Sequence, residues 1–319
     1  MKITVLDGYT LNPGDNPWKP LEELGELVVY DRSMATDIIE RSRDADILLT
    51  NKTPIDGQLI QQLPQLKFIG VMATGINVVD VSAAKERGIP VSNVPEYSTN
   101  SVAQHVMAVL LSMLHRPFEH SVAVYSGQWQ QAVDFSFSLA PLYELSGKTL
   151  GVVGYGRIGK RVCELASAFG MNVLAWNPTF ANKVRLLYER FDWCNREQVF
   201  RESDFVSLHC PLVEDNVGFV DDSILGLMKP TSILINTARG GLINEQHLAN
   251  ALKDGRIAGA CLDVVSTEPI SDDNPLLKAP NCLITPHNAW ATLEARQRLM
   301  QATAQNVEAF LGGSPINLV

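Results

Sequence analysis

Residues 148–159 read KTLGVVGYGRIG and decide the fold class of this chain. The stretch begins as an apolar strand and passes, through a turn with three glycines, into a helical segment that ends near Phe169 and Gly170. The first glycine permits the tight turn, the second lets the backbone approach a pyrophosphate, and the third lets the helix pack on the strand. The helix N-terminus adds amide donors and partial positive charge. The turn therefore predicts a binding site for the pyrophosphate of a dinucleotide.

The expected cofactor-binding residues of this turn are Gly154, Gly156, Arg157, Ile158 and Gly159. A glycine-rich turn without a ligand would also fit the pattern, but the matching strand and helix favour a binding site. Arg157 stands at the helix start, where its side chain either contacts the pyrophosphate or is exposed to solvent.

Short apolar runs alternate with helical segments along almost the whole chain, as is typical of parallel sheets that are buried on both faces. Strands are expected at 3–6, 27–30, 47–50, 68–71 and 91–93, and then at 149–153, 172–176, 205–209, 232–236, 257–263 and 282–285. The sequence therefore predicts an α/β protein with two doubly wound parallel-sheet domains.

A long apolar segment at 101–115 reads as a buried helix that carries the chain from one domain to the next. The tail at 293–311 has helical periodicity and follows the last strand of the second series, so we expect it to fold back on the first domain. The predicted division is a smaller substrate domain, 1–97 plus 290–319, with a dinucleotide-binding Rossmann domain, 98–289, inserted in it.

Composition excludes several classes of function. The net charge is −9, from 26 basic and 35 acidic residues without a block of like charge, which disfavours binding to nucleic acid or to an anionic membrane. The start of the chain resembles neither a signal peptide nor a membrane span, and we expect a cytoplasmic protein. The five cysteines are scattered without the close pairing of zinc sites, so we expect reduced thiols and no metal; they are Cys163, Cys194, Cys210, Cys261 and Cys282.

The end of the second Rossmann strand bears on the choice of cofactor. An Asp or Glu commonly stands there and hydrogen-bonds the ribose 2′-hydroxyl, but residues 176–179 read WNPT. Asn177 can still hydrogen-bond a ribose, yet it lacks the charge that repels a 2′-phosphate, and Lys183 or Arg185 would attract one. We therefore expect NAD and leave NADP open.

Three side chains with complementary chemistry follow three of the expected strands, namely Arg239, Glu268 and His287. Because the carboxyl ends of parallel strands line the ligand crevice, all three can face the cofactor. A guanidinium binds a carboxylate in a bidentate manner, an imidazole exchanges a proton near neutral pH, and a neighbouring carboxylate holds one tautomer. This set predicts hydride transfer between a nicotinamide and a 2-oxo or 2-hydroxy acid.

Each of these residues also has a structural interpretation. An arginine most often forms a surface ion pair, and a single histidine is more often structural than catalytic. The small residues beside Arg239, which are Ala238, Gly240 and Gly241, allow a ligand to approach closely and favour the functional interpretation.

The motifs together resemble the D-isomer-specific 2-hydroxyacid dehydrogenase family across nearly the full chain. They are GYGRIG at 154–159, NTARGGLINEQHLANAL at 236–252, DVVSTEP at 263–269 and TPHNAWAT at 285–292. The resemblance implies an enzyme in which Arg239 binds and polarises the substrate, His287 is the acid/base and Glu268 tunes His287. It also implies a flavodoxin-like substrate domain and a homodimer, with 101–115 as a plausible contact.

Further residues follow from the resemblance. The loop ATGIN at 73–77 is similar to the family's substrate loop, and Lys52 stands at another strand end, where it is either near the cleft or solvated. The expected substrate-binding residues are Lys52, Thr74, Gly75, Ile76 and Trp290. The expected additional cofactor-binding residues are Asn177, His209, Cys210, Pro211, Thr237, Ala238 and Asp263. For Asp263 the alternative is an ordinary cap at the strand end.

Within the family, Trp290 and the opening segment VLDGYTLNPGDNPW at 5–18 most resemble glycerate dehydrogenases, also called hydroxypyruvate reductases. One departure is Gln104, where the family often has Glu. The alternatives are an NAD(H)-sensing, corepressor-like binding protein, or a dehydrogenase for another acid such as D-lactate or 3-phosphoglycerate. The first domain has no extra basic cluster for a phosphate, which disfavours the last of these.

Overall fold

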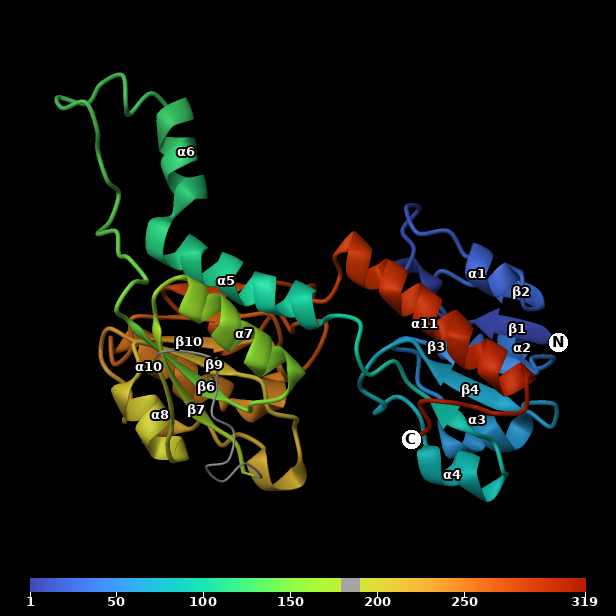
Figure 1. The fold of residues 1–319 in the computed structure, drawn as a ribbon. Helices are drawn as coiled ribbons and strands as arrows, with labels where there is room; N and C mark the ends of the chain where they lie inside the picture. The colour runs from blue at the N-terminus through green and yellow to red at the C-terminus, as the bar shows by residue number, and fades with distance from the viewer. Residues whose placement is uncertain (179–189) are drawn as a thin grey trace. The chain divides into compact units, whose positions relative to one another are not determined.

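The computed structural model describes residues 1–178 and 190–319, and the predicted 2′-phosphate contacts of Lys183 and Arg185 lie outside this part of the chain. The chain divides into two compact units, of which the first comprises Met1–Ser98 with Trp290–Val319 and the second Thr99–Ala289. Each unit is built on one parallel sheet with helices on both faces (Figure 1). The prediction of two α/β parallel-sheet domains is confirmed.

The first unit has a five-stranded sheet in the order β2-β1-β3-β4-β5, in which every pairing is parallel. This is the flavodoxin-like strand order. The strands are β1 (Lys2–Val5), β2 (Glu26–Val29), β3 (Ile47–Thr50), β4 (Phe68–Val71) and β5 (Val91–Ser92). The helices are α1 (Lys19–Glu22), α2 (Ile38–Ser42), α3 (Gly57–Gln62), α4 (Val81–Glu86) and α11 (Leu293–Leu311), with a 3-10 turn at Gly8–Thr10.

Helix α11 packs on the sheet of the first unit, as the sequence predicts for the tail. Figure 1 shows this C-terminal helix, in red, among the blue elements of that unit. Phe310 stacks on Phe68 of β4 with 4.7 Å between ring centroids. The buried Arg296 forms a two-pronged ion pair with Asp15, whose oxygens lie 2.5 and 2.7 Å from its terminal nitrogens. Helix α11 is therefore an integral part of the first unit.

The second unit has a seven-stranded parallel sheet in the order β12-β11-β10-β9-β6-β7-β8, which extends the Rossmann order by one strand. The strands are β6 (Thr149–Val153), β7 (Asn172–Trp176), β8 (Phe191–Trp193), β9 (Phe205–Leu208), β10 (Ile233–Asn236), β11 (Gly259–Leu262) and β12 (Cys282–Ile284). The helices are α5 (Thr99–His115), α6 (Pro117–Tyr125), α7 (Arg157–Ala168), α8 (Arg196–Glu202), α9 (Asp222–Leu225) and α10 (Glu245–Lys253), with 3-10 turns at Glu214–Asn216, Gly240–Leu242 and Pro275–Lys278.

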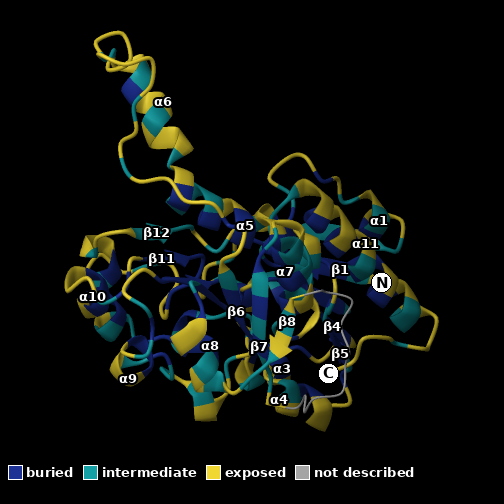
Figure 2. Cartoon of the chain, turned by 60° about the vertical axis from the view of Figure 1, so that its left-hand side comes forward, coloured by how far each residue is buried: buried dark blue, intermediate teal, exposed yellow. Residues whose placement is uncertain are grey.

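Helix α5 buries one face against α7 and the sheet, but the segment after it is largely exposed. Helix α6 and the loop that follows project from the body of the second unit (Figure 1). Figure 2 shows mostly exposed residues along this projection. Its apolar side chains include Tyr125 and Phe135, which are 90% and 91% exposed. Among the residues that the structure describes, no helix has both the length and the apolar character needed to cross a bilayer.

Gly159 and Gly156 provide a matched test of the strand-to-helix turn. A Cβ at Gly159 would overlap the carbonyl oxygen of Gly154, whereas a Cβ at Gly156 would meet no described atom within 4 Å. We expect Gly159→Ala to lower the free energy of unfolding by about 2 kcal/mol, because α7 must move off β6. Gly156→Ala should change it by less than about 0.5 kcal/mol. Urea denaturation of the cofactor-free variants measures both, and equal stability of the two would contradict the close packing at Gly159.

Candidate functional site

The glycine turn lies at the carboxyl edge of the second sheet. Gly154 has a φ of +99° and donates its N–H to the carbonyl of Trp176 at 2.8 Å, which fixes the ends of β6 and β7 side by side. Helix α7 then begins at Arg157, with Gly156 as its N-cap. Asn177 directly follows β7 and so stands beside this turn. Among the described residues no atom lies within 4 Å of a Cβ at Gly156, which leaves room for a pyrophosphate to approach the helix N-terminus.

The segment after β9 packs directly on this turn. A Cβ at Gly154 would lie 2.6 Å from the backbone nitrogen of Cys210 and 2.7 Å from the carbonyl carbon of His209. Burial lowers the pKa of His209 to about 3, so this imidazole is neutral, and its Nε2 lies 2.8 Å from the Ser207 hydroxyl. Burial also raises the pKa of the Cys210 thiol to about 11. Both side chains are therefore uncharged near neutral pH, as suits a packing role. Their contact with the adenosine stays a prediction.

The loop after β10 carries Arg239 and is held by the side chain of Asn236. Asn236 accepts a hydrogen bond from the N–H of Ala238 at 3.0 Å and donates one to the carbonyl of Arg239 at 2.8 Å. Before it, the buried hydroxyl oxygen of Thr237 has no hydrogen-bond partner within the described residues. This buried hydroxyl lies at the predicted cofactor edge, and it fits a site in which a polar cofactor supplies the missing hydrogen bond.

The next loop, after β11, carries Glu268 and rests against the Arg239 loop. A Cβ at Gly240 would overlap the backbone of Val265 and Ser266, so the two loops are in direct contact. Ser266 donates its N–H and its hydroxyl to the carboxylate of Glu245, at 2.6 and 2.9 Å. Glu245, the first residue of α10, therefore anchors the Glu268 loop. This role of Glu245 could not be predicted from the sequence, because a carboxylate in a first helical turn is ordinarily explained by the helix dipole.

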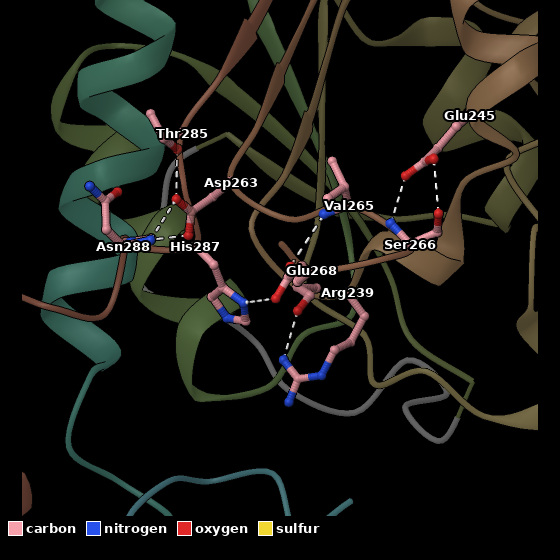
Figure 3. Close-up of polar contacts among 11 residues, drawn as sticks. Arg239, Glu245, Asp263, Val265, Ser266, Glu268, Thr285, His287 and Asn288 are labelled. Carbon is pink, nitrogen blue, oxygen red and sulfur yellow. Dashed lines mark hydrogen bonds and ion pairs between the residues drawn. The ribbon is translucent and has the colours of Figure 1, made fainter. Parts of the chain in front are cut away.

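His287 and Glu268 form a hydrogen-bonded pair. The Nδ1 atom of His287 lies 2.6 Å from Oε2 of Glu268, and both side chains are partly exposed. With Nδ1–H donated to the carboxylate, Nε2 is the ring nitrogen that stays available for proton exchange. Figure 3 shows Arg239, Glu268 and His287 grouped beyond the strand ends, with the His287–Glu268 contact as a dashed line.

The backbone of His287 has a φ of +51°, in the left-handed region that few residues other than glycine adopt. Asp263, only 2% exposed, holds this conformation. Its carbonyl accepts the N–H of His287 at 2.8 Å, and its carboxylate accepts the N–H groups of Asn288 and Ala289 at 3.0 and 2.9 Å. Its carboxylate also accepts the hydroxyl of Thr285 at 2.6 Å. The alternative of a strand-end cap thus describes Asp263 well, and its predicted contact with the nicotinamide stays a prediction.

The predicted substrate-binding residues belong to the first unit. Thr74 donates its hydroxyl to the carbonyl of Val94 at 3.0 Å, which pins the loop that continues into Gly75 and Ile76. The backbone N–H of Lys52 donates to Asp7 at 2.6 Å. The Trp290 and Tyr97 rings meet edge to face with 6.1 Å between centroids. All five substrate-binding assignments stay predictions.

Comparison with known proteins accords with this geometry. Residues 107–289 match the family described as D-isomer specific 2-hydroxyacid dehydrogenase, NAD binding domain. The chain is 49% identical to a hydroxypyruvate reductase of Blautia hydrogenotrophica, over 100% of this chain and 99% of that protein. It is 41% identical to a glycerate dehydrogenase of Methylorubrum extorquens, over 89% of this chain and 88% of that protein.

A solved structure supports the same assignment. It is an NADPH-dependent glyoxylate/hydroxypyruvate reductase from Sinorhizobium meliloti, in complex with NADP and malonate. The identity is 27%, the TM-score is 0.81, and the alignment covers 100% of this chain and 96% of that one. The fold, the glycine turn and the family match agree, so the prediction of an oxidoreductase that uses NAD or NADP is confirmed. The chain belongs to the D-isomer specific 2-hydroxyacid dehydrogenase family.

Proposed function

We propose that this enzyme is a glycerate dehydrogenase/hydroxypyruvate (glyoxylate) reductase. The observation that carries the proposal is the 2.6 Å pair of His287 and Glu268, next to the Arg239 loop, at the carboxyl edge of the Rossmann sheet. The similarity to a hydroxypyruvate reductase over the full chain supports the choice of substrate. In this scheme Thr99–Ala289 is the NAD(P)-binding domain, and the other unit is the substrate domain.

The bound nicotinamide would supply a hydride to the carbonyl carbon of the 2-oxo acid. Arg239 would bind the substrate through its guanidinium, which suits a carboxylate and polarises the adjacent carbonyl. His287 would deliver the proton from Nε2 to the carbonyl oxygen, because its Nδ1 is already committed to Glu268. Glu268 would hold the tautomer and stabilise the imidazolium that forms in the oxidation direction.

The proposed cofactor is NAD, with NADP open. Gly154, Gly156 and Gly159 would cradle the pyrophosphate, and the hydroxyl of Thr237 would gain a polar partner. Asn177 can hydrogen-bond a ribose hydroxyl, but it provides no charge to repel a 2′-phosphate. The NADP bound to the Sinorhizobium relative agrees with leaving the second cofactor open.

We place the enzyme in the cytoplasm. All five cysteines are free, and burial raises the pKa values of Cys163, Cys194, Cys210, Cys261 and Cys282. Unreactive, unpaired thiols are typical of proteins from a reducing compartment.

A homodimer is supported by the projection formed by α6 and residues 126–143. Its exposed apolar side chains include Phe118, Tyr125, Trp129, Val133 and Phe135. An apolar surface of this kind marks a protein interaction site, and a two-fold dimer would cover the same surface on both copies. A cavity of about 380 Å³, lined by Met113, Arg116 and Phe205 among others, lies at the base of the projection and offers room for side chains of the second copy.

Substrate choice is tested by reduction of a panel of 2-oxo acids at neutral pH, with NADH and with NADPH. We expect kcat/KM for hydroxypyruvate and glyoxylate to exceed those for pyruvate and 3-phosphohydroxypyruvate by about tenfold or more. The decrease in cofactor absorbance measures each rate. If the enzyme reduces none of the acids with either cofactor, the proposed function is refuted. If it prefers pyruvate, the assignment moves to another member of the family.

His287→Asn tests the acid/base assignment. We expect kcat/KM to fall by about 10³-fold, because the amide cannot exchange a proton, while the dissociation constant of NADH changes by less than about twofold. Steady-state rates and cofactor fluorescence measure the two quantities. His115→Asn, at the exposed end of α5, is the matched control and should behave as the wild type. Retained turnover in the His287 variant would show that another group supplies the proton.

The double variant Val133→Glu/Phe135→Glu tests the interaction surface. Two charges in an apolar contact should shift the sedimentation coefficient from that of a dimer to that of a monomer at micromolar concentration. Val217→Glu, at an exposed apolar residue outside the projection, is the control and should leave the dimer intact. A dimer that persists in the double variant would place the contact elsewhere.

A further inference from the structure

His105, on α5, contacts the strand-end loop that carries His287 although 180 residues separate it from that loop. Its Nε2 atom lies 3.1 Å from the hydroxyl oxygen of Thr285 and 3.7 Å from Oδ1 of Asp263. Four residues earlier on the same helix, the buried Ser101 donates its hydroxyl to the carbonyl of Ala289 at 2.6 Å. Residues i and i+4 share one face of a helix, so α5 braces both ends of the 285–289 segment.

The proton positions in this cluster are determined by its members. The hydroxyl of Thr285 donates its only proton to the Asp263 carboxylate at 2.6 Å, so it can offer only a lone pair to His105. The Nε2 atom of His105 must therefore carry a proton and act as the donor. Burial lowers the pKa of His105, against the opposing charge of Asp263, which favours a neutral imidazole with its single proton on Nε2.

This series of contacts ends at the backbone of the loop that carries His287. Asp263, to which Thr285 donates, also accepts the N–H groups of Asn288 and Ala289, and its carbonyl accepts that of His287. A donor that holds the Thr285 hydroxyl in its rotamer therefore keeps the Asp263 carboxylate turned toward these amides. His105 thus acts on the backbone of His287 by way of Thr285 and Asp263, whereas Glu268 contacts the imidazole ring of His287.

We propose that His105 is a positioning residue for the reaction: through its Nε2–H it fixes Thr285 and Asp263, and through them the backbone of His287. The proposal rests on the proposed function only in its kinetic consequence, because the contacts themselves join residues of this chain. The proposed role requires a hydrogen-bond donor at the position of Nε2 of His105. It does not require a particular charge or side-chain volume there. Glutamine can place an amide donor near that position, whereas leucine fills the volume without any donor.

The experiment compares His105→Leu and His105→Gln with the wild type, and uses Gln104→Leu as the matched control, because Gln104 is the exposed neighbour on the same helix. The first readout is hydrogen exchange of the amides of His287, Asn288 and Ala289 in the cofactor-free protein. We expect exchange about tenfold faster in His105→Leu and within about twofold of the wild type in His105→Gln. The control should leave these amides as protected as in the wild type.

The second readout is turnover of the best 2-oxo acid from the substrate panel. Displacement of His287 should lower kcat by about tenfold in His105→Leu, with the KM for NADH changed by less than about twofold, and His105→Gln should restore most of the rate. Thermal denaturation identifies a variant that has lost its fold. If His105→Leu is lost in this way, exchange of the three amides in His105→Gln more than about twofold faster than in the wild type overturns the proposal.

The proposal is overturned if His105→Leu leaves the three amides as protected as in the wild type. It is also overturned if His105→Gln matches His105→Leu in exchange and in kcat, because the donor is then not what matters. Absence of turnover in the wild type would instead refute the proposed function, and the exchange measurement would still decide the role of His105.

Discussion

The buried carboxylate of Asp263 is the interaction on which the arrangement of the candidate site depends. A charge in a residue only 2% exposed is costly unless several donors satisfy it. Here the Thr285 hydroxyl and two consecutive backbone amides do so, all from the segment that follows β12. The charge can be buried only if this segment folds around it, so the carboxylate selects one conformation of the loop and with it the position of His287.

The parallel sheet places the other candidate residues at the same edge as the loop that Asp263 holds. Strands β6, β9, β10, β11 and β12 run in one direction, and the loops after them carry the glycine turn, His209, Arg239, Glu268 and His287 in that order. Two glycines allow these loops to touch, since Gly154 lies against the segment after β9 and Gly240 against the segment after β11. Backbone contact between loops leaves little freedom for each to move alone, which suits the proposed meeting of their side chains with one substrate.

The sequence predicts those parts of the site that follow from local pattern. The glycine turn, the strand-end positions of Arg239, Glu268 and His287, and the return of the tail to the first unit can all be deduced from spacing and periodicity. The structure adds β8, a three-residue edge strand, and α6, a helix in which only Ala123 is buried. His105 and Glu245 could not be recognised, because their partners are distant in sequence and neither residue type at a helical position predicts a distant partner.

The left-handed backbone of His287 connects a local sequence motif with a contact to a residue that is distant in sequence. A residue with a Cβ in this region costs about 1 kcal/mol relative to an ordinary conformation. One hydrogen bond to a charged group contributes about 1.5 to 3 kcal/mol, so the amides of Asn288 and Ala289 on Asp263 more than offset that cost. The motif TPHN in the sequence therefore encodes a strained turn that is stable only when Asp263 is present beneath it. Since His287 also meets Glu268 through its ring, the imidazole is fixed from its backbone and from its side chain, which is what the proposed role of His287 as proton donor requires.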